Sequence, residues 1–314
     1  MISPTFAVAP GQDGQRLDLF LCAALPPLSR KRIKRALDSG QVQLNGQIQR
    51  VASTSVRVGD VVVYAGDTTA LAPVTPPSSL DLIFRDDHLL AINKPAGLPC
   101  HANAAGKPHA LGLVTALLQR EGRETPPILL HRLDEDTSGV LVFALTAAAN
   151  RSLSRQFADR RTDKIYLALV AGTPPERCTV RNFLKAKVRG RTLAVRSGGQ
   201  PAETRCRCLW QGEDIALVAC KPLTGRTHQI RVHLAGEGLP ILGDRLYGGP
   251  TAVPQDGNPL RLSRHLLHAA ALSFTHPGSG APCTISAPLP DDMQALLPAS
   301  VVAALPQACA IGLF

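Results

Sequence analysis

Aromatic side chains are scarce in this chain of 314 residues, where Phe, Trp and Tyr together make up 4%, with one Trp and three Tyr. Proteins that stack many successive bases of a nucleic acid use rows of aromatic rings. This composition therefore excludes an extensive stacking platform. Long apolar runs are missing as well. No stretch reaches the roughly 18 uninterrupted apolar residues of a membrane-spanning helix, and we expect no membrane partner.

Metal-binding patterns are also missing. The eight cysteines are scattered and none forms a C-x-x-C pair, although Cys206 and Cys208 would share one face of a strand-like run. His228 and His233 lack the Glu of the H-E-x-x-H zinc motif. We therefore expect no metal and interpret the cysteines as core or surface thiols.

Signals for nucleotide binding and for export are missing too. Gly106-Lys107 has the wrong spacing for a phosphate-binding loop, because the preceding Gly97 is nine residues away and neither Ser nor Thr follows the Lys. The residues from Met1 to Phe6 lack a basic region followed by an apolar one. This start predicts no signal peptide and a cytoplasmic location.

The charge is strongly one-sided. Lys and Arg number 34 against 24 Asp and Glu, a formal net charge of +10. Such a balance favours a polyanionic partner, with nucleic acid the first choice and anionic lipid the second.

Residues 13–65 have the pattern of a small module. Apolar residues from Leu17 to Ala24 predict a short helix, and Ser29 is placed to cap a second helix that Gly40 ends. Asn45-Gly46 is a strong signal for a two-residue hairpin. Ile33, Ala36 and Leu37 supply the buried stripe of the second helix. Its remaining surface is covered by Arg30, Lys31, Arg32, Lys34 and Arg35.

This basic helix followed by a hairpin resembles the RNA-binding domain first described in ribosomal protein S-four. The alternative is a solvated basic helix without a partner. If the resemblance holds, the basic side chains contact mainly phosphate and set affinity rather than sequence choice.

Residues 66–79 are rich in Thr, Ala, Pro and Ser and read as a linker. Residues 80–290 then hold many short strand patterns and few helical ones, which predicts a mixed, largely antiparallel α+β domain. Within it, the basic stretch of residues 178–199 reads as a surface hairpin or loop within reach of RNA. Residues 291–314 form an Ala- and Leu-rich tail that we expect to be helical.

One polar stretch of this domain, His131 to Gly139, lies between two apolar runs that suit buried strands. It carries a His, an Arg, three carboxylates and a Thr-Ser-Gly turn. It could be a plain loop whose Asp and Ser cap their own backbone. Charge between core strands is otherwise costly unless it is paired or functional, and the Arg- and His-rich segment from Leu223 to Leu234 could supply partner charges.

Three blocks together resemble the signature segments of the RluA-type RNA pseudouridine synthases. They are His131-Arg132-Leu133-Asp134, the strand-like run from Lys164 to Val170, and the segment from Gly225 to His233. The resemblance spans roughly residues 80–290, and a preceding S-four-type module is common in this family. The sequence departs from the family pattern at Pro99-Cys100-His101-Ala102, which leaves the choice of substrate open.

The resemblance implies that uridine is isomerised to pseudouridine within RNA, without a cofactor and with the target base flipped out of its helix. By motif position Asp134 is the essential carboxylate, acting as nucleophile or base, and Arg231 pairs with it. Tyr166 lies against the target base, and Arg132 fills the gap that the base leaves. Weaker candidates for phosphate contact are Arg226 and Lys94.

Family resemblance makes large-subunit ribosomal RNA the first expected substrate and transfer RNA the second, with the protein a monomer. Two other classes of function stay open. One is a non-catalytic RNA-binding or ribosome-assembly factor that uses the basic module alone. The other is a nucleoside or glycoside hydrolase with Asp134 and Asp136 as paired carboxylates, which a two-residue offset in a strand would place on one face.

Overall fold

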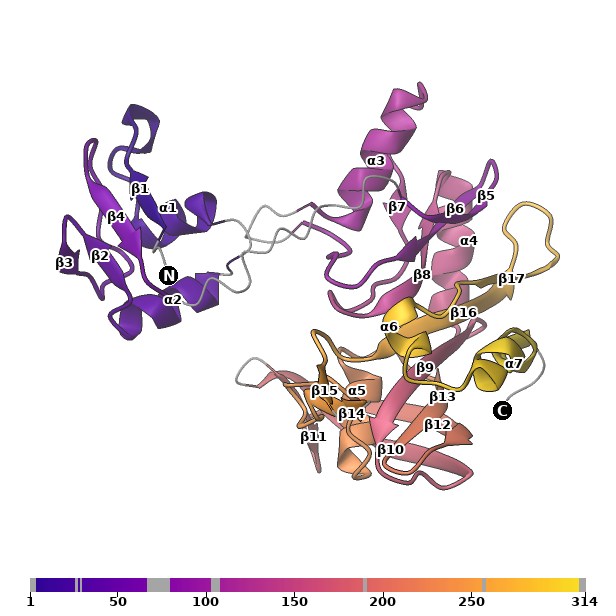
Figure 1. Ribbon diagram of the computed structural model, residues 1–314. Coiled ribbons are helices and arrows are strands. Elements are labelled where there is room, and N and C mark those ends of the chain that lie inside the picture. Colours follow the sequence, from indigo (N-terminus) through magenta and orange to yellow (C-terminus); the bar gives the residue numbers. More distant parts are fainter. Residues whose placement is uncertain are drawn as a thin grey trace. The chain divides into compact units, whose positions relative to one another are not determined.

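The computed structural model describes residues 4–25, 28, 30–66, 80–102, 108–188, 191–255 and 258–310. The backbone falls into two compact units (Figure 1). The first comprises Met1–Ser78 with His101–His109, and the second comprises Ser79–Cys100 with Ala110–Phe314. Apart from Gly66, the predicted linker of residues 66–79 lies outside the described residues, as does the predicted cap Ser29.

The N-terminal unit is a small sheet covered by two helices. Its strands lie in the order β1-β4-β2-β3, and α1 packs against α2. The elements are β1 (Thr5–Ala7), η1 (Pro10–Gln12), α1 (Leu17–Ala24), α2 (Arg30–Asp38), β2 (Val42–Leu44), β3 (Gln47–Ile48) and β4 (Val61–Tyr64). The hairpin between β2 and β3 turns at Asn45 and Gly46, with φ of 53° and 79°. These left-handed values confirm the predicted two-residue turn.

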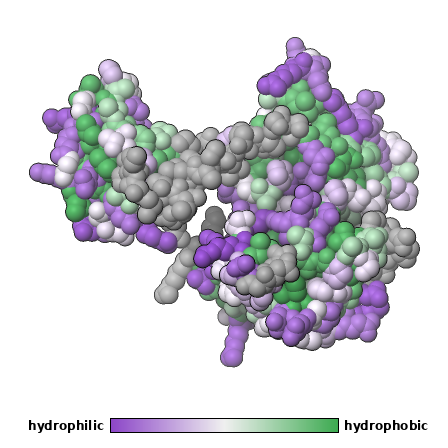
Figure 2. Space-filling model, in the orientation of Figure 1, coloured by the Kyte–Doolittle hydropathy of each residue, from purple (hydrophilic) through white to green (hydrophobic). Residues whose placement is uncertain are grey.

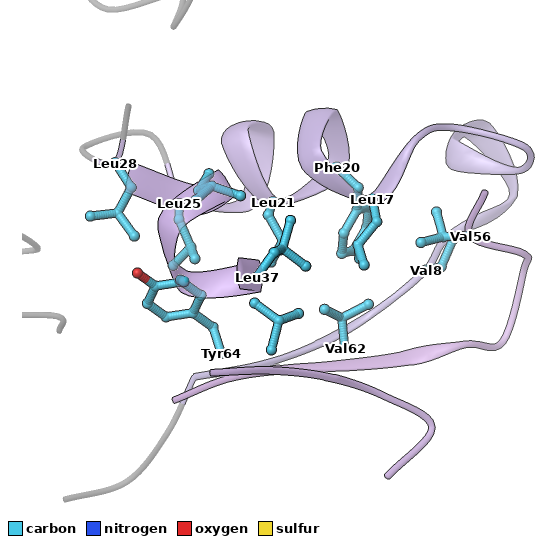
Figure 3. Packing of buried hydrophobic residues seen from close by; sticks show 13 residues of the cluster. Val8, Leu17, Phe20, Leu21, Leu25, Leu28, Leu37, Val56, Val62 and Tyr64 are labelled. Carbon is cyan, nitrogen blue, oxygen red and sulfur yellow. The ribbon is translucent and has the colours of Figure 1, made fainter. Parts of the chain in front are cut away.

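A single apolar core joins the helices of this unit to its sheet. Leu17 and Leu21 of α1 face Leu37 of α2, and Val62 and Tyr64 of β4 close the core from below (Figure 3). Ile33, Ala36 and Leu37 are buried, so the predicted stripe of α2 is confirmed. Burying this stripe turns the rest of the helix toward solvent, where Lys34 and Arg35 are exposed.

The second unit is built on one large sheet. Its strand order is β11-β10-β12-β13-β9-β16-β8-β6-β5, with β17 added on β16 and β7 on β8. Among the described strands only β8 and β16 pair in parallel, so the predicted mixed, largely antiparallel α+β fold is confirmed. The strands are β5 (Leu82–Arg85), β6 (Leu89–Lys94), β7 (Ile128–Leu129), β8 (Ser138–Ala144), β9 (Asp163–Ala171), β10 (Arg177–Val188), β11 (Arg191–Val195), β12 (Gln200–Gln211), β13 (Ile215–Pro222), β16 (Leu267–Thr275) and β17 (Pro282–Ser286).

Helices cover this sheet in separate places. α4 packs against β8 and β16, while α5 packs against β11, β12 and β13. The remaining elements are α3 (Ala110–Arg120), α4 (Ala147–Ala158), α5 (Gln229–Gly236), the hairpin of β14 (Ala252–Gln255) and β15 (Asn258–Arg261), α6 (Asp291–Gln294) and α7 (Ala299–Ala310). The last two confirm a helical tail. No helix among the described residues is both long and apolar enough to cross a membrane.

The core of the second unit explains why its central strands are apolar throughout. Every residue of β8 is buried, because α3 and α4 both contribute side chains to the clusters around it. On the visible face of the unit, hydrophilic residues and patches of apolar residues lie side by side (Figure 2). The two strands that meet in parallel, β8 and β16, lie in the middle of the sheet, and the polar loop of residues 130–137 leads directly into β8.

Candidate active site

The loop before β8 is held by a close approach of two backbones. Gly139 has φ of 110°, and a Cβ at this position would overlap the carbonyl oxygen of Ala269 on β16. Only glycine allows both this φ and this contact. In the two residues before Gly139, hydroxyls bind buried imidazoles: Thr137 Oγ1 lies 2.8 Å from His265 Nε2, and Ser138 Oγ lies 2.9 Å from His268 Nδ1. The Thr-Ser-Gly turn therefore fixes the loop onto β16.

Lys94 anchors the same loop from the other side. It is fully buried, and its Nζ donates at 2.8 Å to each of the carbonyl oxygens of Pro95, Leu98 and Glu135. An ammonium has three N–H groups, and all three are used. The prediction that Lys94 contacts RNA phosphate is therefore wrong, because the side chain is closed off from solvent and joins the turn after β6 to the loop that carries Asp134.

Cys100 adds a second support at this point. The amide of Leu133 donates to Cys100 Sγ at 3.2 Å, and the thiol lies 3.3 Å from the carbonyl oxygen of the same residue. The segment that departs from the family pattern thus holds the residue next to Asp134 in place.

Asp134 and Arg231 form an ion pair, although 97 residues separate them in the sequence. Arg231 Nη1 lies 2.9 Å from Asp134 Oδ2, and the guanidinium is nearly buried, while the carboxylate is 19% exposed. One carboxylate oxygen of Asp134 therefore contacts a cation, while the exposed part of the carboxylate lines the cavity in front of it. The structure brings together the two residues on which the functional prediction depends.

A second carboxylate holds the same arginine and was not predicted as a site residue. Asp244 accepts from Arg231 Nε at 2.7 Å and from Nη2 at 2.8 Å, and its side chain is wholly buried. Burial alone would raise the pKa of Asp244, but the hydrogen bonds and charge of Arg231 lower it. Burial likewise opposes the charged form of Arg231, and Asp244 and Asp134 raise its pKa above the usual value. Both groups are thus kept ionised.

The cavity in front of Asp134 has a volume of about 350 Å³. Tyr166 of β9 lines one wall, and Lys164 of the same strand lies with its Nζ 5.1 Å from the centre of the Phe157 ring. Burial, with smaller contributions from Asp134 and Cys100, raises the pKa of Tyr166, so its phenol stays neutral. A flat ring, an aliphatic stem and a carboxylate around a hollow of this size suit one planar heterocycle with its sugar.

His131 also lines the cavity, as a neutral imidazole. Burial, helped by the charge of Lys164, lowers its pKa to about 3. Its Nε2 accepts the amide hydrogen of Val142 at 3.2 Å, so the ring proton lies on Nδ1. The imidazole ring lies 5.6 Å from the ring of Phe157, and both rings line the cavity.

His228 is a further residue of the site that sequence reasoning missed. His228 is the residue that precedes α5, and it has a left-handed φ of 55°. This conformation is uncommon for a residue other than glycine and often marks a functional position. The turn places His228 Nε2 at 3.8 Å from Asp134 Oδ2 and Nδ1 at 2.8 Å from the hydroxyl of Tyr247.

The predicted RNA-contacting arginines of this unit are placed differently. Arg132 is exposed at the rim of the cavity and has no hydrogen-bonding or ion-pair partner among the described residues. Arg226 also lines the cavity, and its Nε donates to the carbonyl oxygen of Pro201 at 3.2 Å. Both side chains line the cavity, with Arg132 exposed and Arg226 half-buried, as contacts to a strand that enters it would require.

In the N-terminal unit the predicted cations do not form one uniform set. Arg30 donates to the buried carboxylate of Asp18 at 2.8 Å while half of its side chain is exposed. Lys34 and Arg35 are exposed on the same helix. Lys31 and Arg32 lie in α2, but their side chains are outside the described part of the chain. In the described residues of the whole chain no group of three or more His, Cys, Asp or Glu could hold a metal ion.

Comparison with known proteins places relatives along nearly the whole chain. Residues 88–236 match the family model described as RNA pseudouridylate synthase, and residues 15–62 match the S4 domain. An uncharacterized RNA pseudouridine synthase of Chloroflexus aurantiacus is 43% identical, with 92% of this chain and 91% of the relative covered. The ribosomal large subunit pseudouridine synthase D of Xanthomonas campestris is 38% identical, over 91% and 89% of the two chains.

One solved structure and a further relative give the same result. The human RNA pseudouridylate synthase domain containing 4 superposes with a TM-score of 0.56 at 28% identity, over 68% of this chain and 90% of that one. The ribosomal large subunit pseudouridine synthase C of Escherichia coli O157:H7 is 36% identical, over 93% and 94% of the two chains. An S4 domain followed by this catalytic fold, matched over nearly the whole length, means that the chain belongs to the RluA-type family of RNA pseudouridine synthases, which are isomerases.

Proposed function

We propose that this enzyme converts uridine to pseudouridine in structured RNA by means of Asp134. The observation that carries the proposal is the ion pair between Asp134 and Arg231 in the lining of the cavity. Isomerisation requires that the bond between the base nitrogen and the sugar breaks, that the uracil rotates, and that a carbon atom of the base is joined to the sugar instead. A carboxylate positioned by a fixed cation can serve the first step as nucleophile or as base.

The other predicted residues have positions that suit this chemistry. The neutral ring of Tyr166 packs against the base, and the walls of the cavity keep the detached uracil close to the sugar. Arg132 at the rim enters the stack that the extruded nucleotide leaves, since a flipping enzyme needs a group to hold that gap. Arg226 neutralises a neighbouring phosphate.

For the substrate we propose large-subunit ribosomal RNA, with transfer RNA as the second choice. The relatives named for the ribosomal large subunit match this chain over nine-tenths of their length or close to it. An exposed basic helix in the S4 unit and the charge of +10 suit a large polyanion. A cytoplasmic monomer is the simplest form for this role.

The test is the substitution Asp134→Asn, which keeps the shape of the side chain and removes its charge. We expect pseudouridine formation to fall by about 10³-fold or more, the range of an essential acid–base group, while RNA binding persists. RNA from cells that lack the protein is incubated with each variant and mapped by mass spectrometry. Asp136→Asn is the matched control. Full activity of Asp134→Asn would rule out the assignment.

The same pair of variants separates the hydrolase alternative. That hypothesis placed Asp134 and Asp136 on one face of a strand, but residues 134–137 form a turn. Asp136 does not belong to the lining of the cavity that holds Asp134. A hydrolase with paired carboxylates would release free uracil in place of pseudouridine, and both variants would lose that release. A purely RNA-binding role would give no pseudouridine with the wild type or with either variant.

A further inference from the structure

A second hollow of about 780 Å³ continues from the cavity of Asp134. Phe157, Lys164, Gly225 and Arg226 line both, so that the two form one continuous surface. The second hollow extends over the outward face of β10 and the neighbouring part of β12. It is large enough for more than the reacting nucleoside, which occupies the first cavity in our proposed function.

Cations exceed carboxylates along this groove. Arg160, which is exposed in the turn after α4, adds to Lys164, Arg181 and Arg226. The carboxylates on its lining are already paired. Glu203 accepts from Arg181 at 3.1 Å, and Asp163 accepts from Lys221 at 2.7 Å. The remaining positive charge suits a chain of phosphates.

An aromatic ring lies between cations on the exposed face of β10. Alternation along the strand buries Val180 and Leu184 and turns Arg181, Phe183 and Lys185 outward on the other face. Phe183 is 45% exposed and lines the groove. Leaving an aromatic ring in contact with water is unfavourable in free energy compared with burying it. A ring flanked by cations is the arrangement that binds single-stranded nucleic acid.

We propose that this groove binds the single-stranded RNA next to the target uridine, with a flanking base stacked on Phe183. The phosphates on either side of that base are neutralised by Arg160 and by Lys185. The inference rests on the proposed function, because the groove takes its place in the reaction from its continuity with the cavity of Asp134. Phe183 thereby selects for an unpaired nucleotide at one position, since a base within a duplex has no free face to offer.

The first experiment measures stacking without requiring catalysis. Short single-stranded, uridine-containing RNAs carry one 2-aminopurine at successive positions, and quenching of its fluorescence on binding reports a stack. We expect quenching at one position with the full-length protein and its loss in Phe183→Ala. Phe183→Tyr should keep the quenching, because it keeps the ring, and Phe183→Leu should lose it. Ile128→Ala, which removes an exposed apolar side chain on β7, is the control and should quench as the wild type does.

The second experiment measures the same contact in the reaction. Phe183→Ala should raise KM for the RNA about tenfold, the value of one lost base–aromatic stack, with kcat nearly unchanged. Replacing the flanking base by an abasic site should raise the KM of the wild type to the same extent. It should not raise the KM of Phe183→Ala further. Arg160→Ala should reduce the salt dependence of KM, whereas Arg177→Ala, at an exposed position at the start of β10, should not.

The outcomes separate the two proposals. If the wild type forms no pseudouridine but quenching depends on Phe183, the proposed function is refuted and the proposal that the groove binds RNA is supported. If the wild type is active but Phe183→Ala keeps both the quenching and the KM, the groove proposal is overturned. Equal penalties for abasic RNA in the wild type and in Phe183→Ala would overturn it as well, since the base and the ring would then act independently.

Discussion

Arg231 gives two of its hydrogen bonds to Asp244, and this fork determines how the guanidinium faces Asp134. Nε and Nη2 lie 2.7 and 2.8 Å from the two oxygens of Asp244, which leaves Nη1 to reach Asp134 at 2.9 Å. Asp244 is fixed in turn by the amides of Leu246 and Tyr247, which donate to its Oδ1. A bidentate pair restricts the planar guanidinium to one orientation.

Asp244→Asn should therefore reduce both activity and stability. The amide keeps the shape but loses one acceptor and the charge, so that Arg231 is left buried with a weaker partner. Breaking such a pair costs about 3–5 kcal/mol, and chemical denaturation would show a lower midpoint with unchanged slope. The rate of pseudouridine formation should fall because Arg231 is no longer held. Asp214→Asn, an exposed carboxylate in the turn between β12 and β13, is the control. An unchanged midpoint and rate would contradict the role of Asp244.

Some of this site could be predicted from the sequence and some could not. The Asp134–Arg231 pair followed from two motif blocks, and the apolar runs around the first block predicted their strands. Asp244 was not recognised as a site residue. The spacing of residues in the sequence does not show which carboxylate will bind the guanidinium of Arg231 in the folded protein. Lys94 ends an apolar run and was interpreted as an exposed cation. Lys94 is buried because the turn after β6 and the loop of Asp134 both place carbonyl oxygens around its ammonium group. This arrangement depends on tertiary structure, so the local sequence does not show it.

The buried ammonium of Lys94 gives a pH dependence of known sign. Burial lowers its pKa from 10.5 to about 8. Between these values the unfolded chain still binds the proton and the folded chain has released it, so the free energy of unfolding rises with pH in this window. The contribution is about 3 kcal/mol at 1.36 kcal/mol per pKa unit and is absent below pH 8, where both states are protonated.

Lys94→Met removes this titration. Denaturation of the wild type and the variant is measured in parallel at several values between pH 7 and pH 10.5, and the difference at each pH isolates Lys94 from other groups. We expect the free energy of unfolding of the wild type to increase relative to that of the variant as the pH rises. A constant difference over this range would mean that the lysine is protonated throughout when folded, and our assignment of a lowered pKa would be wrong.

Tyr247 joins His228 to β11, and its hydroxyl should matter more than its ring. The hydroxyl accepts the amide of Thr192 at 3.0 Å, donates to the carbonyl oxygen of the same residue at 3.2 Å and lies 2.8 Å from His228 Nδ1. Tyr247→Phe leaves these groups unpaired, at a cost of about 1–3 kcal/mol. The ring still packs on the guanidinium of Arg231, 5.1 Å from its centre.

The consequence for activity is tested by a double-mutant cycle. Tyr247→Phe and His228→Gln should each slow the reaction several-fold if the hydroxyl orients the imidazole beside Asp134. The double variant should then be little slower than either single one, because the contact is lost only once. Additive losses would show that the two side chains act separately.

The exposed face of α2 should control the salt dependence of RNA binding. Each lysine or arginine that neutralises a phosphate releases counterions, and its removal lowers the slope of log K against log salt by about 0.7–0.9, depending on the RNA's strandedness. Lys34→Gln and Arg35→Gln are therefore each expected to reduce this slope by nearly one and to weaken binding equally for different RNA sequences. The positions are exposed, so the fold should not change. Arg57→Gln, outside the helix in the same unit, is the control. A slope that stays at the wild-type value in both α2 variants would remove this helix from the RNA interface, because a cation that contacts phosphate cannot be lost without a change in ion release.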